Sequence, residues 1–283
     1  MSIDFGLRGK VAIVTGGGSR APGIGNGRAA AVLLAEAGAH VVVVDSAPEN
    51  MTETRRLVAE RGGDVLALTA DVTDPDACAG VVRQTVDAFG RLDVLVNNVG
   101  VAGPPGTVVD VDLDAWDRCL RLNLNSMVLM SRAAIPRMRV AGGGSIINMS
   151  SAVGLTGGHP TVAYPTTKAA VVGLTRTMAA QHGPEGIRVN ALAPGYVYTP
   201  MVHSQGVDDG DREQRRLAAP LATEGTGWDV GDAVLFLAGP RSRWITGVVL
   251  PVDAGLTATL GAGSAPSVTS APEPECPVRN FGL

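Results

Sequence analysis

The chain has 283 residues, of which 45% are hydrophobic and 18% are charged, and its formal net charge is −4. This length fits one large α/β domain or two small ones, and the hydrophobic share is ample for a buried core. The slightly acidic balance lacks the basic footprint that nucleic acids and anionic membranes attract.

The cysteines and the amino-terminal residues bear on the compartment. Cys78, Cys119 and Cys276 lie far apart, with neither metal-ligand nor pairing spacing, which fits a reducing environment. The first residues lack the architecture of a signal peptide, and no apolar run is long enough to span a bilayer. We therefore expect a soluble, cytoplasmic protein that binds no metal, nucleic acid or membrane.

The first predicted elements, a strand, a glycine-rich loop and a helix, indicate a dinucleotide-binding motif. An apolar run over residues 10–15 predicts a buried strand, and the Ala/Leu-rich segment after the next glycine-rich loop predicts a helix ending at Gly38. Glycines let the backbone approach a pyrophosphate, and the helix N-terminus supplies N–H donors. The loop is long, and its closing glycine pair is either Gly23 and Gly25 or Gly25 and Gly27.

A second strand, residues 40–45, ends in a carboxylate. Asp45 follows Gly25 by twenty residues, where an acid binds the adenosine ribose hydroxyls of NAD and repels the 2′-phosphate of NADP. No basic residue follows Asp45 closely, and Arg20 in the glycine-rich loop is the one candidate that could bind the 2′-phosphate of NADP. A solvated strand-end Asp is the simpler alternative. The sequence predicts NAD(H), with alcohol oxidation as the direction in cells.

Strands and helices alternate along the rest of the chain. Further strands are expected at 64–69, 92–96, 144–149, 187–192 and 248–252, and helices at about 49–61, 75–89, 114–139, 164–183 and 230–237. This alternation predicts an α/β fold with a doubly wound parallel sheet (Rossmann fold), forming a single domain over residues 1–260.

Two segments lack that pattern. Residues 201–227 are polar, without firm periodicity, and are expected to form a lid. Their arginines, Arg212, Arg215 and Arg216, alternate with acids, which favours a solvated helix over an anion site. Residues 261–283 form a Gly/Ala/Ser/Pro-rich tail, in which 261–277 are not expected to form a regular element. The tail's aromatic end is a candidate for docking across a subunit boundary.

Tyr164 and Lys168 share one face of a predicted helix, at i and i+4. There an ammonium stabilises a phenolate and lowers the tyrosine pKa from its reference of about 10, so that the phenol exchanges a proton with an alcohol or carbonyl. An exposed pair without function is the simpler alternative. Because Pro165 follows directly, Tyr164 must lie in the first turn of its helix.

Polar or glycine-rich positions follow several predicted strands, where ligands bind in this fold. They are Asp45, Asp71, Asn97, Ser151 and Pro194-Gly195. This convergence predicts one shared site.

Together and in order, these features resemble the compact short-chain dehydrogenase/reductase family over about residues 7–260. The matching motifs are Thr15-Gly16 with its loop, Asp71-Val72, Asn97-Asn98-Val99-Gly100, Asn123, Ser151, Tyr164-x-x-x-Lys168, Pro194-Gly195 with Thr199, Ile245-Thr246-Gly247 and Val252-Asp253. Long glycine loops occur in the family's enoyl-reductase branch, but its tyrosine and lysine are more widely spaced, so that chemistry is not expected here.

The resemblance implies a homotetrameric oxidoreductase that transfers a hydride between NAD(H) and a secondary alcohol or ketone. It implies that Tyr164 is the general acid/base, that Ser151 bonds the reacting oxygen, and that Lys168 binds the nicotinamide ribose. Asn123 would order a proton-relaying water; a helix-interior Asn bonding its own turn is the simpler alternative. The implied cofactor-binding residues are Gly16, Ser19, Arg20, Gly23, Ile24, Gly25, Asp45, Asp71, Val72, Asn97, Gly100, Tyr164, Lys168, Pro194, Gly195, Val197 and Thr199.

Two other functions remain as alternatives. A non-catalytic nucleotide-binding regulator would keep the fold and lose the chemistry, yet all four catalytic positions hold the expected residue types. An epimerase or dehydratase of the longer related branch would need a larger carboxyl-terminal substrate domain than the residues after Pro200 provide.

Overall fold

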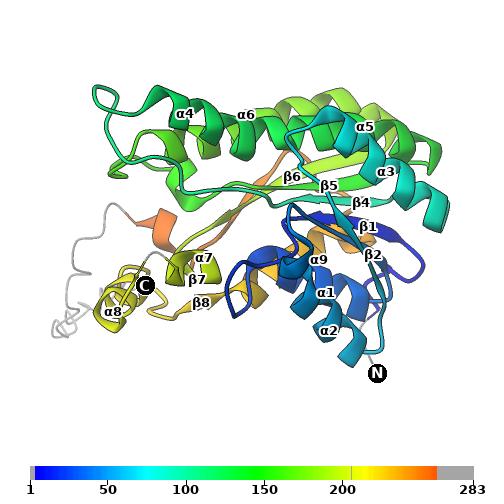
Figure 1. Ribbon diagram of the computed structural model, residues 1–283, viewed down its shortest axis with the longest axis horizontal. Helices are drawn as coiled ribbons and strands as arrows, with labels where there is room; N and C mark the ends of the chain where they lie inside the picture. Colours follow the sequence, from blue (N-terminus) through cyan, green and yellow to red (C-terminus); the bar gives the residue numbers. More distant parts are fainter. Residues whose placement is uncertain (1–3, 205, 260–283) are drawn as a thin grey trace, which may run out of the picture.

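The computed structural model describes residues 4–204 and 206–259, which form a three-layered α/β structure around a parallel sheet (Figure 1). Seven strands pair in the order β3-β2-β1-β4-β5-β6-β9, all parallel. Their bounds are β1 Val11–Thr15, β2 His40–Asp45, β3 Val65–Thr69, β4 Val94–Asn97, β5 Gly144–Met149, β6 Ile187–Pro194 and β9 Val249–Val252. The strand order reverses between β1 and β4, which is where a doubly wound sheet opens a binding crevice.

Helices cover both faces of the sheet (Figure 1). One face carries α1 Asn26–Glu36, α2 Thr52–Glu60 and α9 Gly227–Ala238. The other carries α3 Pro75–Phe89, α4 Leu113–Leu120, α5 Ser126–Val140 and α6 Ala163–His182. Short 3₁₀ turns are η1 Pro48–Met51, η3 Ala152–Gly154, η4 Gly183–Glu185, η5 Pro240–Ser242 and η6 Leu256–Ala258.

Burial on both faces explains why the strands are continuous apolar runs. Alternate residues of β1 and β2 point to opposite layers. Val14 and Val43 pack with α1 and α9, whereas Ile13 and Val42 pack with α3, α5 and α6. The predicted fold class is therefore confirmed, and most predicted strands match the observed ones to within two residues.

Local signals also placed helix ends correctly. Asp74 caps α3 by accepting from the amides of Asp76 and Ala77, and Pro75 occupies the first turn. Tyr164 lies in the first turn of α6, as Pro165 requires. No helix in the described ranges combines the length and apolar character needed to cross a bilayer.

The single helix expected over residues 114–139 is interrupted. Between α4 and α5 lies a π-helical segment, η2 Arg121–Asn125, which contains Asn123. A π segment inserts one extra residue into the turn, and such insertions occur often at functional sites. The apolar pattern is nearly unchanged by one inserted residue, so it did not reveal the interruption.

Residues 201–227 are more regular than expected. They contain most of α7 Pro200–His203, all of α8 Asp209–Leu217 and the strand β8 Gly225–Thr226, which pairs with β7 Val197–Tyr198. α8 has no buried residue, and a capping box between Asp208 and Asp211 begins it. The helix is stabilised by its cap and by ion pairs and not by burial, so its sequence shows no apolar periodicity. The expectations for residues 261–283 lie outside the described residues.

Candidate active site

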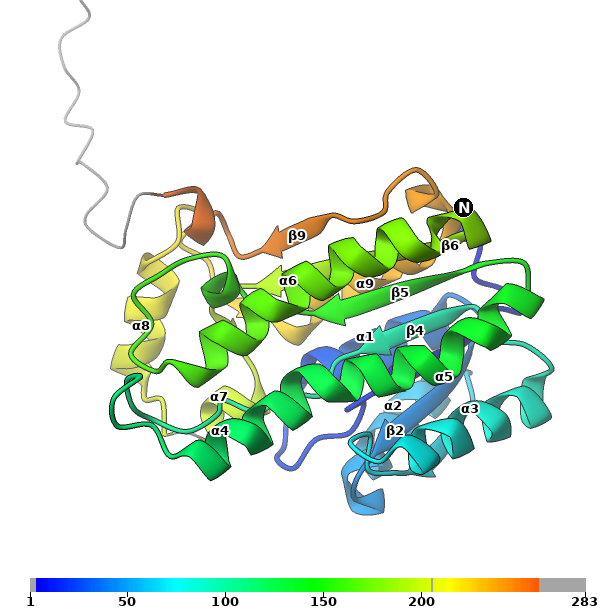
Figure 2. The ribbon, with the colours of Figure 1, turned by 90° about the horizontal axis from the view of Figure 1, so that it is seen from above.

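A cleft of about 990 Å³ lies at the carboxyl ends of the strands. The arrows of β5 and β9 point toward the side of the molecule where α7 and α8 lie (Figure 2). Most of the predicted site residues line this cleft: Gly16, Ser19, Arg20, Gly25, Asp45, Asp71, Val72, Gly100, Ser151, Tyr164, Lys168, Pro194, Gly195, Val197 and Thr199. Gly23, Ile24, Asn97 and Asn123 do not line it.

Tyr164, Ser151 and Lys168 line the cleft together. Ser151 follows β5 and donates to the Pro194 carbonyl at 3.4 Å, and Lys168 lies one turn after Tyr164 on α6. The Lys168 Nζ donates to the Met149 carbonyl at 2.8 Å and lies 5.7 Å from the centre of the Tyr164 ring. The sequence separates serine from tyrosine, but the fold brings a hydroxyl, a phenol and an ammonium to one place.

The electrostatics of this group differ from the expectation that Lys168 lowers the tyrosine pKa. Burial raises the pKa of Tyr164, and the interaction with Ser151 opposes this only in part. Lys168 is itself only 3% exposed, and burial lowers its pKa to about 8. The ammonium is bonded to the Met149 carbonyl and is not hydrogen-bonded to the phenol, so desolvation dominates at both side chains.

Asn123 lies behind the cleft wall and is fully buried. Its Oδ1 accepts from the Val101 amide at 2.7 Å, and its Nδ2 donates to the Val101 carbonyl at 2.9 Å and to Thr167 Oγ1 at 3.1 Å. The side chain thus ties the loop after β4 to α6, and its Nδ2 also donates to Cys119 Sγ, one turn earlier, at 3.3 Å. Gly100 fits in this loop because a Cβ there would lie 3.3 Å from both Asn123 Oδ1 and Lys168 Nζ.

The two asparagines after β4 have different roles. Asn97 is buried, and its Nδ2 donates to Ser131 and to Asn148. Asn98, which belongs to the matching motif but was not among the expected cofactor-binding residues, lines the cleft and donates to the carbonyls of Thr15 and Gly16. Asn98 therefore holds the glycine turn against the end of β4, across the point where the strand order reverses.

The structure distinguishes the two possible glycine pairs of the loop. Gly25 is the N-cap of α1, and a Cβ on Gly27 would lie 2.3 Å from the Gly16 carbonyl oxygen. Only glycine allows that approach of helix to turn. Gly23, with a φ of +112°, faces Pro200 instead. Gly25 and Gly27 are thus the pair that packs the helix entry.

Arg28 stabilises the lengthened loop and was also missed by the sequence analysis. It is 2% exposed, and its guanidinium donates to Thr54 Oγ1 at 3.1 Å, to the Asn50 carbonyl and to the Gly23 carbonyl. Burial lowers the pKa of Arg28, and the charges of Glu53 and Asp45 oppose this. An arginine within an otherwise apolar helix start was the available signal.

Asp45 ends β2 at the edge of the cleft. Its Oδ1 accepts from Asn50 Nδ2 at 2.7 Å, and a Cβ on Gly18 would lie 2.7 Å from its Oδ2. At the start of α1, Asn26 lines the cleft with a buried Oδ1 that has no hydrogen-bond partner among the described residues. These features are suited to binding a dinucleotide whose ribose hydroxyls are free: a carboxylate, a close glycine backbone, a helix N-terminus and a buried acceptor.

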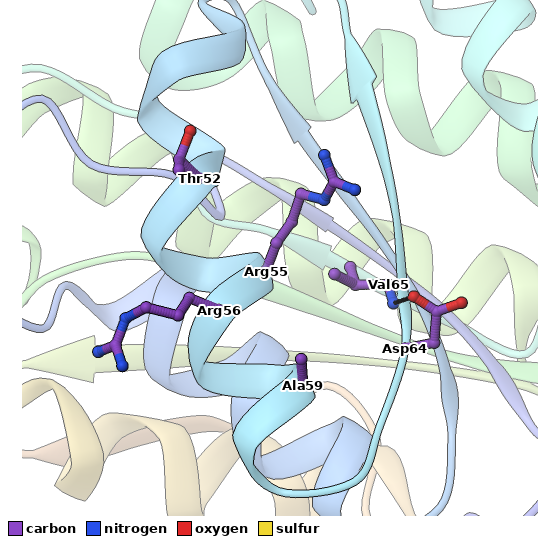
Figure 3. A pocket seen from close by; sticks show the side chains of 6 residues that line it. All are labelled: Thr52, Arg55, Arg56, Ala59, Asp64 and Val65. Carbon is purple, nitrogen blue, oxygen red and sulfur yellow. Dashed lines mark hydrogen bonds between the residues drawn. The ribbon is translucent and has the colours of Figure 1, made fainter.

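A second hollow, of about 300 Å³, lies beside α2 and the start of β3 (Figure 3). It is lined by Thr52, Arg55, Arg56, Ala59, Asp64 and Val65. The guanidinium of Arg56 is paired with Glu53 and Glu60, and Asp64 accepts from the Val65 amide. It offers no group of reactive side chains comparable to that of the cleft.

The fold and the cleft define a dinucleotide-binding oxidoreductase with a tyrosine–lysine pair. A family model described as enoyl-(acyl carrier protein) reductase matches residues 20–257. The chain is 38% identical over 249 residues to cis-4-hydroxycyclohexanecarboxylate dehydrogenase of Sinomonas cyclohexanicum, covering 88% of this chain and 97% of that protein. The chain belongs to the short-chain dehydrogenase/reductase family, as the sequence motifs predicted.

Solved structures agree with this assignment. A short-chain dehydrogenase/reductase from Burkholderia xenovorans has a TM-score of 0.86 at 40% identity, covering 90% of this chain and 99% of that one. Carveol dehydrogenase from Mycobacterium avium, solved in complex with NAD, has a TM-score of 0.83 at 32% identity, covering 89% and 99%.

Proposed function

We propose that this protein is a dehydrogenase that transfers a hydride between NAD(H) and a secondary alcohol or its ketone. The observation that supports this most directly is the meeting of Ser151, Tyr164 and Lys168 in a cleft that also contains Asp45. Relatives named as dehydrogenases of hydroxycyclohexanecarboxylates and of carveol support a secondary alcohol on a carbocyclic ring as the substrate.

The residues of the cleft divide the proton chemistry among them. Bound NAD(H) supplies the hydride acceptor or donor at its nicotinamide ring. Tyr164 takes the hydroxyl proton in oxidation and returns it in reduction. Ser151 hydrogen-bonds the reacting oxygen, and the Lys168 ammonium stabilises negative charge on the phenol. Burial strengthens each of these interactions because water screens them less.

Asn123 acts in this scheme by positioning other groups. Its amide bonds both backbone groups of Val101 and also Thr167, so it holds the loop after β4 beside Lys168. The sequence-based role of Asn123, ordering a proton-relaying water, stays a prediction.

Replacing the proton carrier tests the proposal. In Tyr164→Phe we expect oxidation to fall by about 10²-fold or more, because general acid–base catalysis contributes that much. NAD binding should change little, because the ring is kept. The matched control is Tyr198→Phe, on β7, which is not among the residues that line the cleft. Near-full activity of Tyr164→Phe on a panel of cyclic alcohols would contradict the mechanism.

A non-catalytic regulator remains the contrasting function, and the relatives give it no support because they are named as enzymes. It predicts nucleotide binding without turnover of any alcohol or ketone. The same panel of substrates distinguishes the two functions.

We also infer that residues 201–227 act as a lid within one dehydrogenase domain spanning residues 1–260. Met201, Val202, Ser204 and Arg215 contribute to the lining of the cleft from this segment. The strand β7, just before the segment, pairs with β8 near its end, which anchors it. Replacing the segment with a short Gly/Ser linker should raise KM for the alcohol more than for NAD.

For assembly we propose a cytoplasmic homotetramer. The edge strand β9 has no outer neighbour among the described residues, and Trp244 near it is 90% exposed. Val108, Val109 and Leu113, before and at the start of α4, are 72% to 91% exposed. Apolar surface of this extent is typical of faces that other copies cover. Light scattering should give four times the chain mass, and the mass of one chain would refute the assembly.

A further inference from the structure

The three arginines of α8 have different surroundings. Arg212 bonds both carboxylate oxygens of Glu224, at 3.0 and 2.8 Å. Arg216 bonds both oxygens of Glu213, at 2.7 Å each. These two side chains fit the solvated, ion-paired helix that the sequence predicted.

Arg215 is different. It lines the cleft together with Tyr164 and Ser151, and its guanidinium lies 4.8 Å from the centre of the Tyr196 ring. No carboxylate among residues 4–204 and 206–259 is within 4.0 Å of it, and no hydrogen bond from it is found in those ranges. Burial lowers the pKa of the guanidinium, but an arginine remains charged in proteins.

An unpaired, half-buried cation is costly unless a ligand supplies acceptors. A guanidinium has five N–H donors in a planar fork that matches a carboxylate in two parallel hydrogen bonds. Stacking on Tyr196 restricts the plane of this fork, which prepares it for such a partner. The nearby Glu224 cannot compete because Arg212 occupies both of its oxygens.

The charges along the cleft lining are also unequal. Its acidic side chains in the described structure are Asp45 and Asp71, which follow β2 and β3. The part of the cleft that α6 and α8 line has two basic side chains, Lys168 and Arg215, and no acidic side chain in its lining. An anion entering there meets two cations, whereas Asp211 and Glu224, whose charges also act on Arg215, do not line the cleft.

We propose that Arg215 binds a carboxylate of the substrate, so that the enzyme acts on hydroxy acids and their oxo acids in preference to neutral alcohols. This inference rests on the proposed dehydrogenase function, which it makes more specific. The carboxylate would be recognised by the lid helix while the hydroxyl is presented to Ser151 and Tyr164.

The test compares substrates that differ only in the acid group. Initial rates with NAD are measured for 3- and 4-hydroxycyclohexanecarboxylate and for cyclohexanol, in the wild-type protein and in Arg215→Met, Arg215→Lys and Arg216→Met. Methionine keeps an unbranched side chain over Tyr196 and removes the charge. Arg216→Met is the matched control, because Arg216 is on the same helix and is paired with Glu213.

We expect Arg215→Met to raise KM for the hydroxy acids by roughly 10- to 100-fold, the range typical of a lost charged hydrogen-bond pair. The kcat should change little, because the carboxylate is bound equally in ground and transition states. Cyclohexanol kinetics should be unchanged, Arg215→Lys should keep part of the affinity, and Arg216→Met should resemble the wild type. A hydroxy-acid KM unaffected by Arg215→Met would overturn the inference, as would equal losses for acid and neutral alcohol.

A binding measurement separates this inference from the dehydrogenase function. Calorimetric titration with cyclohexanecarboxylate, which has no hydroxyl to oxidise, should show binding that Arg215→Met weakens by a similar factor. If that binding is found but no alcohol is oxidised, the dehydrogenase proposal fails and the anion site stands. If alcohols are oxidised but the wild type binds no carboxylate, the anion site fails and the dehydrogenase stands.

Discussion

The choice between NAD and NADP depends on one carboxylate, and the structure allows its effect to be estimated. Asp45 is held at the end of β2 by Asn50, with its Oδ2 close to the Gly18 backbone, so it cannot turn away freely. Two unit charges about 4 Å apart repel by about 4 kcal/mol at an effective dielectric constant of 20. Because Asp45 is partly exposed, we halve this to about 2 kcal/mol, a preference for NAD of roughly 30-fold.

The assay is kcat/KM for NAD and for NADP with one alcohol substrate, in the wild type, Asp45→Ala and Asp45→Asn. Both variants should lose affinity for NAD and gain relative activity with NADP. The ratio of kcat/KM for NAD to kcat/KM for NADP should therefore fall by about the factor by which Asp45 favours NAD. Asp71→Ala is the control, because Asp71 also lines the cleft but its carboxylate accepts from the amide and hydroxyl of Thr73.

Arg20 also lines the cleft and bears on the same question. If it compensates for a 2′-phosphate, Arg20→Ala will lower activity with NADP alone. Equal or better wild-type kcat/KM with NADP would refute the reasoning about Asp45.

Two further predictions concern buried charge. Because burial raises the pKa of Tyr164 above its ordinary value of 10.0, the phenol is neutral near pH 7, and the rate of alcohol oxidation should rise with pH from 7 to about 8, where Lys168 begins to lose the charge that stabilises the phenolate; a flat profile over that range would argue against Tyr164 as the base. Arg28→Met removes one hydrogen bond to the Thr54 hydroxyl and leaves the Gly23 carbonyl without its donor, so unfolding by urea should show a loss of about 2–4 kcal/mol and NAD should bind more weakly. The exposed Arg56→Met should cost much less stability, and equal losses for the two variants would remove the special role of Arg28.

Much of the fold followed from local chemistry in the sequence. The apolar runs at residues 11–15 and 40–45 are buried on both faces, so their composition predicts strands before any contact is known. Asp74-Pro75 fixed the start of α3, and Pro165 placed Tyr164 in the first turn of α6. The family could be predicted because its chemistry needs particular residue types at nearly constant spacing.

What the sequence could not show depends on partners that are distant along the chain. Whether Gly23 or Gly27 packs against the first glycine turn at the start of α1 depends on where the Gly16 carbonyl lies. The π-helical segment at Asn123 could not be predicted because one extra residue in a turn leaves the apolar pattern almost unchanged.

The arginines of α8 show the same limit most clearly. In sequence, Arg212, Arg215 and Arg216 are equivalent members of a charged helix. Only the tertiary structure decides that Glu224 and Glu213 neutralise two of them while the third stacks on Tyr196 in the cleft. Pattern and composition determine which segments form helices and strands, because burial and capping are local. The neighbours of a charged side chain, and hence its function, depend on how distant segments pack.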